Sequence, residues 1–197
     1  MLTDGAHKRG CTFEPAAAKY LVETAGEDIS TLQNELNKLC FYLPGGTITW
    51  QDVDLVSVKT VEASVYNLSK HIFARDAGGA LKTLDELFFM RLEPMIILYT
   101  VSSAYVDLYR VFVCRKKGLK NPEIAAEFGY KGREFVLDRA AQSLSKFDFK
   151  RLSLSFEALL AADRQLKSFG ADPRTVLEQL IVRLIYIIAK GESVDKA

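Results

Sequence analysis

The sequence predicts an all-α fold. Apolar residues recur at intervals of three and four along almost the whole chain, and no segment shows the strict alternation of a half-buried strand. Proline, glycine and short capping side chains stand where these apolar stretches begin and end. Hydrophobic residues make up 49% of the 197 positions, which is enough apolar material for a core and excludes a disordered or low-complexity protein.

The helices of the first section have recognisable starts. One begins with proline, which is favoured at the first helical position, and is followed by glycine at its end. The next has an aspartate N-cap. A third opens on a threonine and aspartate that resemble a capping box. The predicted ranges are 15–26, 29–43 and 49–56, with starts at Pro15, Asp28 and Thr49.

The helices of the second section are predicted in the same way. The longest begins at Pro94 and ends at Lys117, before Gly118 and after a basic triplet that suits the negative end of a helix. The other predicted ranges are 65–73, 81–88, 121–129, 133–146, 148–167 and 172–190. The two glycine pairs, Gly45–Gly46 and Gly78–Gly79, are interpreted as turns. The whole chain is predicted to be helical and to form no sheet.

Charge divides the chain into two parts, although the net charge is only +1. Residues 1–63 hold 5 basic and 9 acidic side chains, a net −4, whereas residues 107–151 hold 11 and 6, a net +5. This shift predicts a domain boundary near residues 57–63. The near-neutral total argues against a general polyanion-coating protein but leaves local nucleic-acid binding open.

No catalytic or cofactor site is predicted. Neither glycine pair follows a strand or belongs to a phosphate-binding loop, and the three cysteines, Cys11, Cys40 and Cys114, lack metal-ligand spacing. His71 is interpreted as a structural or exposed side chain, because the sequence offers it no catalytic partners. We therefore expect a non-catalytic chain with neither cofactor nor metal.

A reducing compartment is predicted from the sparse, odd number of cysteines. The most apolar segment, 94–113, contains Asp107 and Arg110, so as a membrane span it would bury two charges in lipid. A buried helix of a soluble, cytoplasmic protein is the better interpretation, and no membrane partner is expected.

Residues 121–146 have two interpretations. A short helix, a turn at Gly129 and a longer helix match a helix-turn-helix unit, with Ala125 as the small residue where the helices approach. A DNA-binding regulator using Arg133 and Arg139 is then one hypothesis. A plain αα-corner is the other, because the apolar residues of the second helix leave few positions free to read bases.

Two surfaces are singled out for binding. The last helix is apolar almost all round, so it lies in the middle of its own bundle or completes an interface with another subunit, and the sequence slightly favours an interface. Its candidate interface residues are Leu177, Leu180, Ile181, Leu184, Ile185 and Ile188. The basic residues either contact DNA or an acidic partner, or they cap a helix end and stay solvated. They are Arg115, Lys116, Lys117, Lys120, Arg133 and Arg139.

A family resemblance runs through most of the chain. The segment from Glu27 to Leu39 resembles a sequence pattern of the bacterial DNA polymerase III delta subunit family. The segment from Ile48 to Val53 resembles the next pattern of the same family. The later segments that are similar to this family are 65–73, 80–87, 123–129, 163–168 and 172–178. The order and spacing of these segments along the chain make the resemblance to the family specific.

The resemblance implies an architecture and a partner set. Delta belongs to the clamp loader, whose subunits share an ATPase-like N-terminal domain, a small helical lid and a helical collar that packs into a ring of five. This chain would then be the end of a lid, 1–57, followed by a helical-bundle collar, 61–197, with Met1 as an artificial or truncated start. The implied partners are other loader subunits and, without sequence preference, DNA. The sliding clamp would be reached only through the N-terminal domain. Polymerase activity would belong to the holoenzyme by membership.

Overall fold

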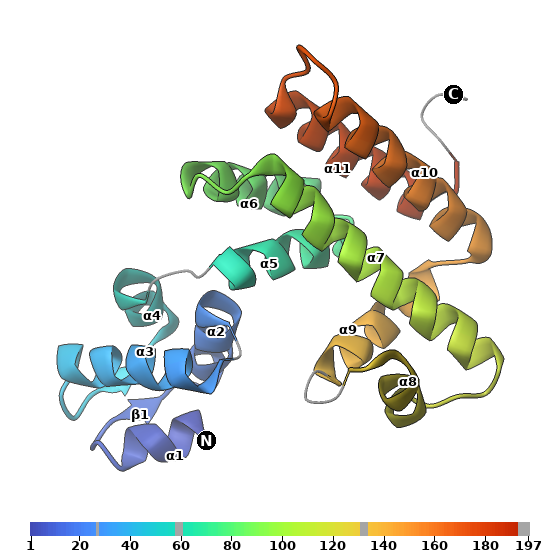
Figure 1. Cartoon of the computed structure of the whole chain (residues 1–197). Coiled ribbons are helices and arrows are strands. Elements are labelled where there is room, and N and C mark those ends of the chain that lie inside the picture. Colours follow the sequence, from blue (N-terminus) through green and yellow to red (C-terminus); the bar gives the residue numbers. More distant parts are fainter. Residues whose placement is uncertain (27, 58–60, 131–133, 193–197) are drawn as a thin grey trace. The chain divides into compact units, whose positions relative to one another are not determined.

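A computed structural model describes residues 1–26, 28–57, 61–130 and 134–192. It confirms the all-α prediction, since helices make up nearly all of the regular structure (Figure 1). The chain divides into two compact units, Met1–Asn67 and Leu68–Ala197. The division falls inside one helix, α5 (Val61–Ala74), somewhat later than the boundary that the charge shift predicts.

The first unit begins with two elements that the sequence did not indicate. Residues predicted as a polar terminus form the short helix α1 (Leu2–His7), which carries the exposed His7. Correcting the prediction of no sheet, β1 (Thr12–Phe13) pairs in parallel with β2 (Thr47–Ile48). Strands of two residues are too short to show any periodicity. The remaining helices are α2 (Pro15–Ala25), α3 (Ile29–Tyr42) and α4 (Trp50–Val56), followed by the start of α5.

The predicted caps of the first unit are confirmed. The carboxylate of Asp28 accepts the N–H of Thr31 at 2.7 Å and so begins α3. Thr49 and Asp52 form the capping box of α4, with the Thr49 N–H 2.8 Å from the Asp52 carboxylate. These caps satisfy N–H groups that have no partner inside the helix. The core that α1 to α4 enclose is apolar and consists of Ala6, Cys11, Ala17, Leu21, Ala25, Leu32, Leu36, Leu39, Cys40, Ile48 and Val53.

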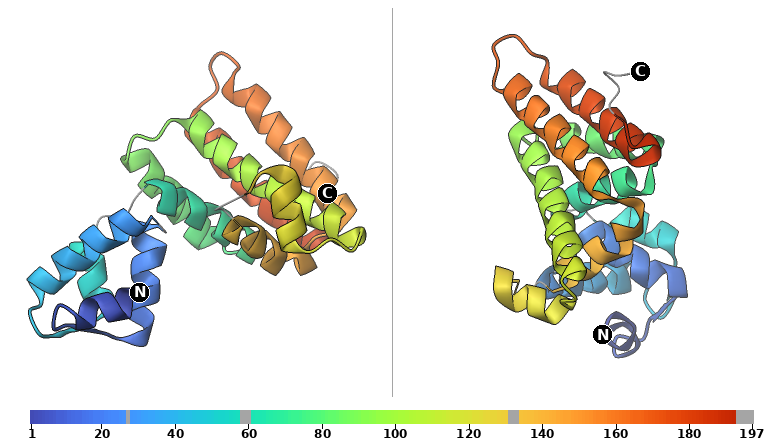
Figure 2. Two further views of the ribbon diagram at one scale, coloured as in Figure 1. Left: turned by 60° about the horizontal axis from the view of Figure 1, so that its bottom comes forward. Right: turned by 90° about the vertical axis from the view of Figure 1, so that its right-hand side faces the viewer.

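The second unit is a helical bundle around α7 (Pro94–Lys116), which contacts α8 to α11 (Figure 1). Before α7 lies α6 (Ala77–Phe89), and after it come α8 (Asn121–Phe128), α9 (Phe135–Ser143) and one 3-10 turn, Leu144–Lys146. The chain ends in a hairpin of two long helices, α10 (Phe149–Leu166) and α11 (Pro173–Lys190) (Figure 2). The aspartates predicted as caps, Asp148 and Asp172, accept the N–H groups that begin these helices.

Aromatic rings fill the centre of this bundle. Tyr105 of α7 is fully buried, and its ring meets those of Phe73, Phe147 and Phe156 edge to face, at centroid distances of 5.1, 5.9 and 6.5 Å. Such pairs contribute about 0.5–1.5 kcal/mol each beyond the burial of their area. The cluster joins α5, α7 and α10 with the segment that precedes α10, so the middle of α7 is a fixed part of the core.

The start of α6 corrects one prediction. Gly78 and Gly79, interpreted from the sequence as a turn, lie in the first turn of this helix. The Asp76 carboxylate accepts the Gly79 N–H at 2.9 Å and lies 2.7 Å from Nδ1 of His71. A Cβ atom at position 79 would stand 2.2 Å from the Asp76 carboxylate and 2.4 Å from His71. Glycine is therefore used here for close packing inside a helix, which periodicity does not reveal.

Helix α7 is long and apolar enough to cross a membrane by length and composition, and it is the one such helix in the described part of the chain. In the structure it is packed by neighbouring helices, and Asp107 on it is buried within the protein. A core helix meets the same length and hydropathy criteria as a membrane span. Its surroundings here are those of a core helix.

Candidate assembly and nucleic-acid surfaces

The predicted subunit interface lies on helix α11, which has a broad apolar surface. The structure packs α11 against α6, α7 and α10 of the same chain. Five of the six predicted interface residues are buried there, none more than 4% exposed: Leu177, Leu180, Ile181, Leu184 and Ile188. This corrects the prediction, since a side chain already buried in its own bundle cannot meet a neighbouring subunit. Only Ile185 of the set is partly exposed.

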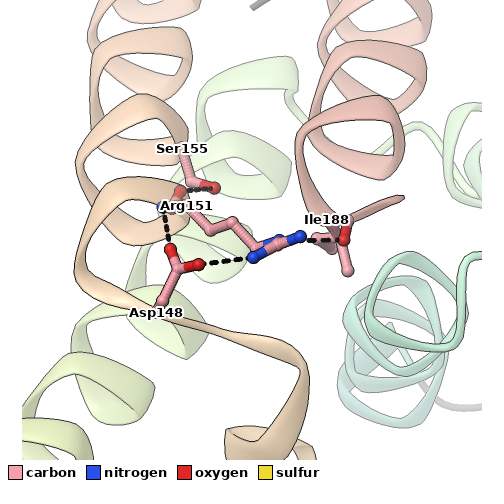
Figure 3. A network of polar contacts seen from close by, with 4 residues as sticks. All are labelled: Asp148, Arg151, Ser155 and Ile188. Atoms are coloured by element: carbon pink, nitrogen blue, oxygen red, sulfur yellow. Dashed lines mark hydrogen bonds and ion pairs between the residues drawn. The ribbon is translucent and has the colours of Figure 1, made fainter. Parts of the chain in front are cut away.

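The end of α11 is fixed by an arginine on α10 (Figure 3). The Nε of Arg151 donates to the carbonyl of Ile188 at 3.2 Å, while the same guanidinium pairs with Asp148. Ser155 donates to the backbone carbonyl of Arg151 at 2.7 Å. The guanidinium lies 3.4 Å from where a Cβ of Gly191 would stand, and Gly191 has a φ of +72°. A C-terminal carbonyl that α11 cannot satisfy itself is thereby paired across the hairpin.

The predicted basic surface is present at the C-terminal end of α7. Arg115, Lys116, Lys117 and Lys120 are all exposed. Arg115 donates to the Asn121 side chain at 2.9 Å, and the ammonium of Lys116 lies 4.5 Å from the centre of the Phe112 ring. The four cations therefore follow one another around one turn between α7 and α8. We call these four residues the basic cluster.

The prediction also named Arg139 and Arg133 as contact residues. Arg139 on α9 is partly buried, and its burial lowers the pKa of its guanidinium. Arg133 lies outside the described residues. The helix-turn-helix interpretation depended on these two arginines as base-reading groups, and nothing in the described part of the chain supports it.

The polar group that sequence reasoning missed joins α7 to the end of α8. Arg110 donates to the hydroxyl of Tyr130 at 2.6 Å, and its guanidinium lies over the rings of Phe128 and Tyr130, 5.1 and 5.6 Å from their centres. Burial and a hydrogen bond to Asp107 raise the pKa of the Tyr130 phenol. The signal in the sequence was a charged pair, Asp107 and Arg110, within an otherwise apolar helix.

A pocket lies between α8 and α9. Its volume is about 370 Å³, and its lining residues are Asn121, Pro122, Ala125, Ala126, Glu134 and Asp138. Asn121 donates to the Asp138 carboxylate and also accepts from Arg115, so it connects this pocket to the basic cluster. The lining holds no serine, threonine, cysteine, lysine or histidine side chain. Ala125 is among the residues that line this pocket.

Metal binding and thiol chemistry have little support among the described residues. No group of three or more histidine, cysteine or acidic side chains is placed to hold a metal ion there. The three cysteines are buried thiols. Burial, with a smaller contribution from the neighbouring Cys11, raises the pKa of the Cys40 thiol to about 11. A thiol with so high a pKa is a poor nucleophile at neutral pH.

Comparison with known proteins gives the same family from sequence and from fold. The model of the DNA polymerase III delta subunit, C-terminal domain, matches residues 62–184. The chain is 23% identical over 175 residues to DNA polymerase III subunit delta of Bacillus subtilis, which covers 88% of this chain and 50% of the relative. It is 26% identical over 156 residues to the probable subunit delta of Aquifex aeolicus, covering 77% and 45% of the two chains.

A solved structure shares the fold. The Bacillus subtilis DNA clamp loader delta protein superposes with a TM-score of 0.76 at 23% identity, covering 93% of this chain and 54% of that one. The chain thus spans about half the length of the relatives that it matches. Because the family model covers more than half of the chain, this protein belongs to the family of the DNA polymerase III delta subunit, C-terminal domain.

Proposed function

We propose that this chain is a non-catalytic assembly part of a bacterial replicative clamp loader. The observation that carries the proposal is the family match over residues 62–184, which coincides with the α-helical bundle of the second unit. The relatives bear the names of clamp-loader and DNA polymerase III delta subunits. A bundle whose helices bury one another, with no catalytic group of side chains among the described residues, suits a scaffold rather than an enzyme.

The two units take different parts in this proposal. The second unit, with most of the predicted range 61–197, acts as the collar that holds loader subunits together. The first unit, which contains the predicted range 1–57, is the end of a lid. The sliding clamp is then a partner only of the domain that precedes the lid in full-length members, and the complex works on DNA in the cytoplasm without a membrane partner.

Contact with DNA is proposed for the basic cluster alone. Four exposed cations that follow one another around one turn can track a phosphate backbone without reading bases. The alternative for this cluster is a purely local role, since the Arg115 side chain bonds Asn121 and Lys116 lies against Phe112. The salt dependence of DNA binding separates the two roles.

The experiment that tests the assembly function is reconstitution. The 197-residue chain is mixed with the purified remaining clamp-loader subunits from the same organism and passed over a sizing column with light-scattering detection. The expected result is elution of the chain in a complex of defined stoichiometry. Elution of the chain apart from every loader subunit, singly and in mixture, would contradict the proposed function.

A further inference from the structure

Large apolar side chains are exposed at one end of the second unit. Phe89, the last residue of α6, is 90% exposed, and Tyr99 in the second turn of α7 is 73% exposed. Met95 and Ile96 in the first turn of α7 are 37% and 45% exposed. All four lie within the short stretch 89–99, at the corner where α6 turns into α7. We call these four residues the α6–α7 corner.

A third exposed aromatic ring lies at the same end of the bundle. Phe169, in the turn between α10 and α11, is fully exposed. The start of α11 is held against α6, because Arg174 pairs with Asp85 at 2.6 Å and its guanidinium lies 5.2 Å from the centre of the Phe88 ring. Figure 1 accordingly shows both turns, α6–α7 and α10–α11, at one end of the unit.

The exposed apolar area of the corner is larger than the area that a single exposed side chain presents. A fully exposed aromatic side chain presents about 150–250 Å², so the exposed fractions of the four residues correspond to about 500 Å². Met95 and Ile96 stand four and three residues before Tyr99 and so neighbour it on α7. The summed area of the four residues is comparable with the largest apolar patch on a typical monomer, which is often functional. It also supplies well over half of the roughly 800 Å² that one partner contributes to a standard interface.

An arginine beside the corner strengthens this interpretation. Arg91 has a φ of +57°, a left-handed conformation that is unfavourable for a residue with a Cβ. Its side chain is exposed and forms no ion pair among the described residues. As at Arg75, this conformation follows a helix end, and the exposed Arg91 guanidinium is available to a partner that approaches the corner. Arginine, methionine and aromatic residues are the types enriched at protein interfaces.

The other surfaces of the bundle fit such a contact less well. The apolar face of α11 is already covered by α6, α7 and α10. The basic cluster stands at the far end of α7, and the rise of about 1.5 Å per residue places Arg115 about 24 Å along the helix from Tyr99, the nearest residue of the corner. A partner seated on the α6–α7 corner therefore leaves the basic cluster open.

We propose that the α6–α7 corner, with Arg91 beside it, is the surface through which this chain contacts another subunit of the clamp loader, an inference that rests on the proposed function. The partner presents an apolar helical face to Phe89 and Tyr99 and a carboxylate to Arg91. Phe169 extends the contact at the same end of the bundle. The partner covers the apolar area that is exposed at this end of the bundle.

The test compares two double variants in the reconstitution described above, by sizing and by titration of the labelled chain with the remaining loader subunits. One is Phe89→Ser with Tyr99→Ser. The matched control is Phe41→Ser with Phe149→Ser, which removes two exposed rings from elsewhere. All four rings are exposed, so both variants should melt as the unchanged chain does. Two interface aromatics should weaken association at least about tenfold, whereas the control should not.

The results distinguish the proposed contact surface from the proposed assembly function. Equal association of both variants and the unchanged chain would overturn the α6–α7 corner and leave the assembly function intact. If the unchanged chain binds no loader subunit, both proposals fail together. If the corner variant loses only an association of the chain with itself, the surface joins copies of this chain, and the assignment to another subunit is wrong.

Discussion

The phenolic hydroxyl of Tyr130 donates a hydrogen bond to the carboxylate of Asp107. Both residues are buried, at 5% and 7% exposure, and they come from the end of α8 and the middle of α7. A carboxylate removed from water is costly unless hydrogen bonds compensate it. The pair therefore requires the end of α8 to lie against one turn of α7, and it explains how an acidic residue is tolerated in the most apolar helix of the chain.

Tyr130→Phe should destabilise the second unit by about 1–3 kcal/mol, because the buried carboxylate loses one hydrogen bond while the packing of the ring is kept. Urea denaturation followed by circular dichroism measures this. The matched control is Tyr109→Phe, since the Tyr109 ring packs on Phe156 and its hydroxyl forms no hydrogen bond in the described part of the chain. Equal unfolding free energies for the two variants would contradict a stabilising role for the Tyr130 bond.

The glycine pair at the start of α6 gives a second prediction. Gly78→Ala should stabilise the chain by about 0.5–1 kcal/mol, because alanine is the better helix former and its Cβ would meet nothing closer than 3.8 Å. Gly79→Ala should instead destabilise it, because the new Cβ would displace Asp76 from the helix cap, at a cost of about 1 kcal/mol. Thermal melts of the two variants should therefore shift in opposite directions. A stabilised Gly79→Ala protein would show that the His71–Asp76 packing is not required.

Arg75 ends α5 with a φ of +63°, where a glycine would be unstrained. Arg75→Gly should therefore stabilise the chain by about 0.5–1 kcal/mol. Arg75→Ala is the control, because alanine also carries a Cβ and keeps the strain. If both substitutions change the melting temperature alike, the side chain and not the backbone conformation of Arg75 determines the effect.

The correction on α11 can be tested with two neighbouring substitutions. Ile181→Asp should cost about 3 kcal/mol or more, because residue 181 is 2% exposed and the carboxylate would be buried without a partner. Ile185→Asp, at a partly exposed position, should cost only about 1 kcal/mol. Denaturant titration of the chain by itself gives both values. Similar small losses for the two would show that α11 is not buried within its own bundle.

The basic cluster predicts a salt dependence. Each phosphate contact adds about −0.9 to the slope of log affinity against log salt on duplex DNA. Lys116→Ala with Lys117→Ala should flatten that slope by about one to two units, whatever the DNA sequence, when binding by the reconstituted loader is titrated. Lys150→Ala with Lys167→Ala is the control, since it removes two exposed lysines from α10 and its C-cap. Equal slopes for all three proteins would leave the cluster as a solvated or protein-facing surface.

Much of the fold could be predicted because its signals are local. Asp28, Thr49, Asp148 and Asp172 cap the helices that the sequence assigned to them, since an N-cap depends on residues only two or three positions away. The paired strands Thr12–Phe13 and Thr47–Ile48 could not be predicted, because each is held by backbone bonds to a distant segment. The position of Gly79 inside a helix likewise depends on His71 from the preceding helix.

The all-α class, the limits of the long helices and the family could be predicted from the sequence, because helix caps, apolar periodicity and family segments are local features of the chain. Which apolar faces remain exposed depends on how the helices pack. Ile181 and Tyr99 lie on two similarly broad apolar helices, yet one is buried by neighbouring helices and the other is exposed. Periodicity shows that a face is apolar, but what covers it depends on contacts between segments far apart in sequence.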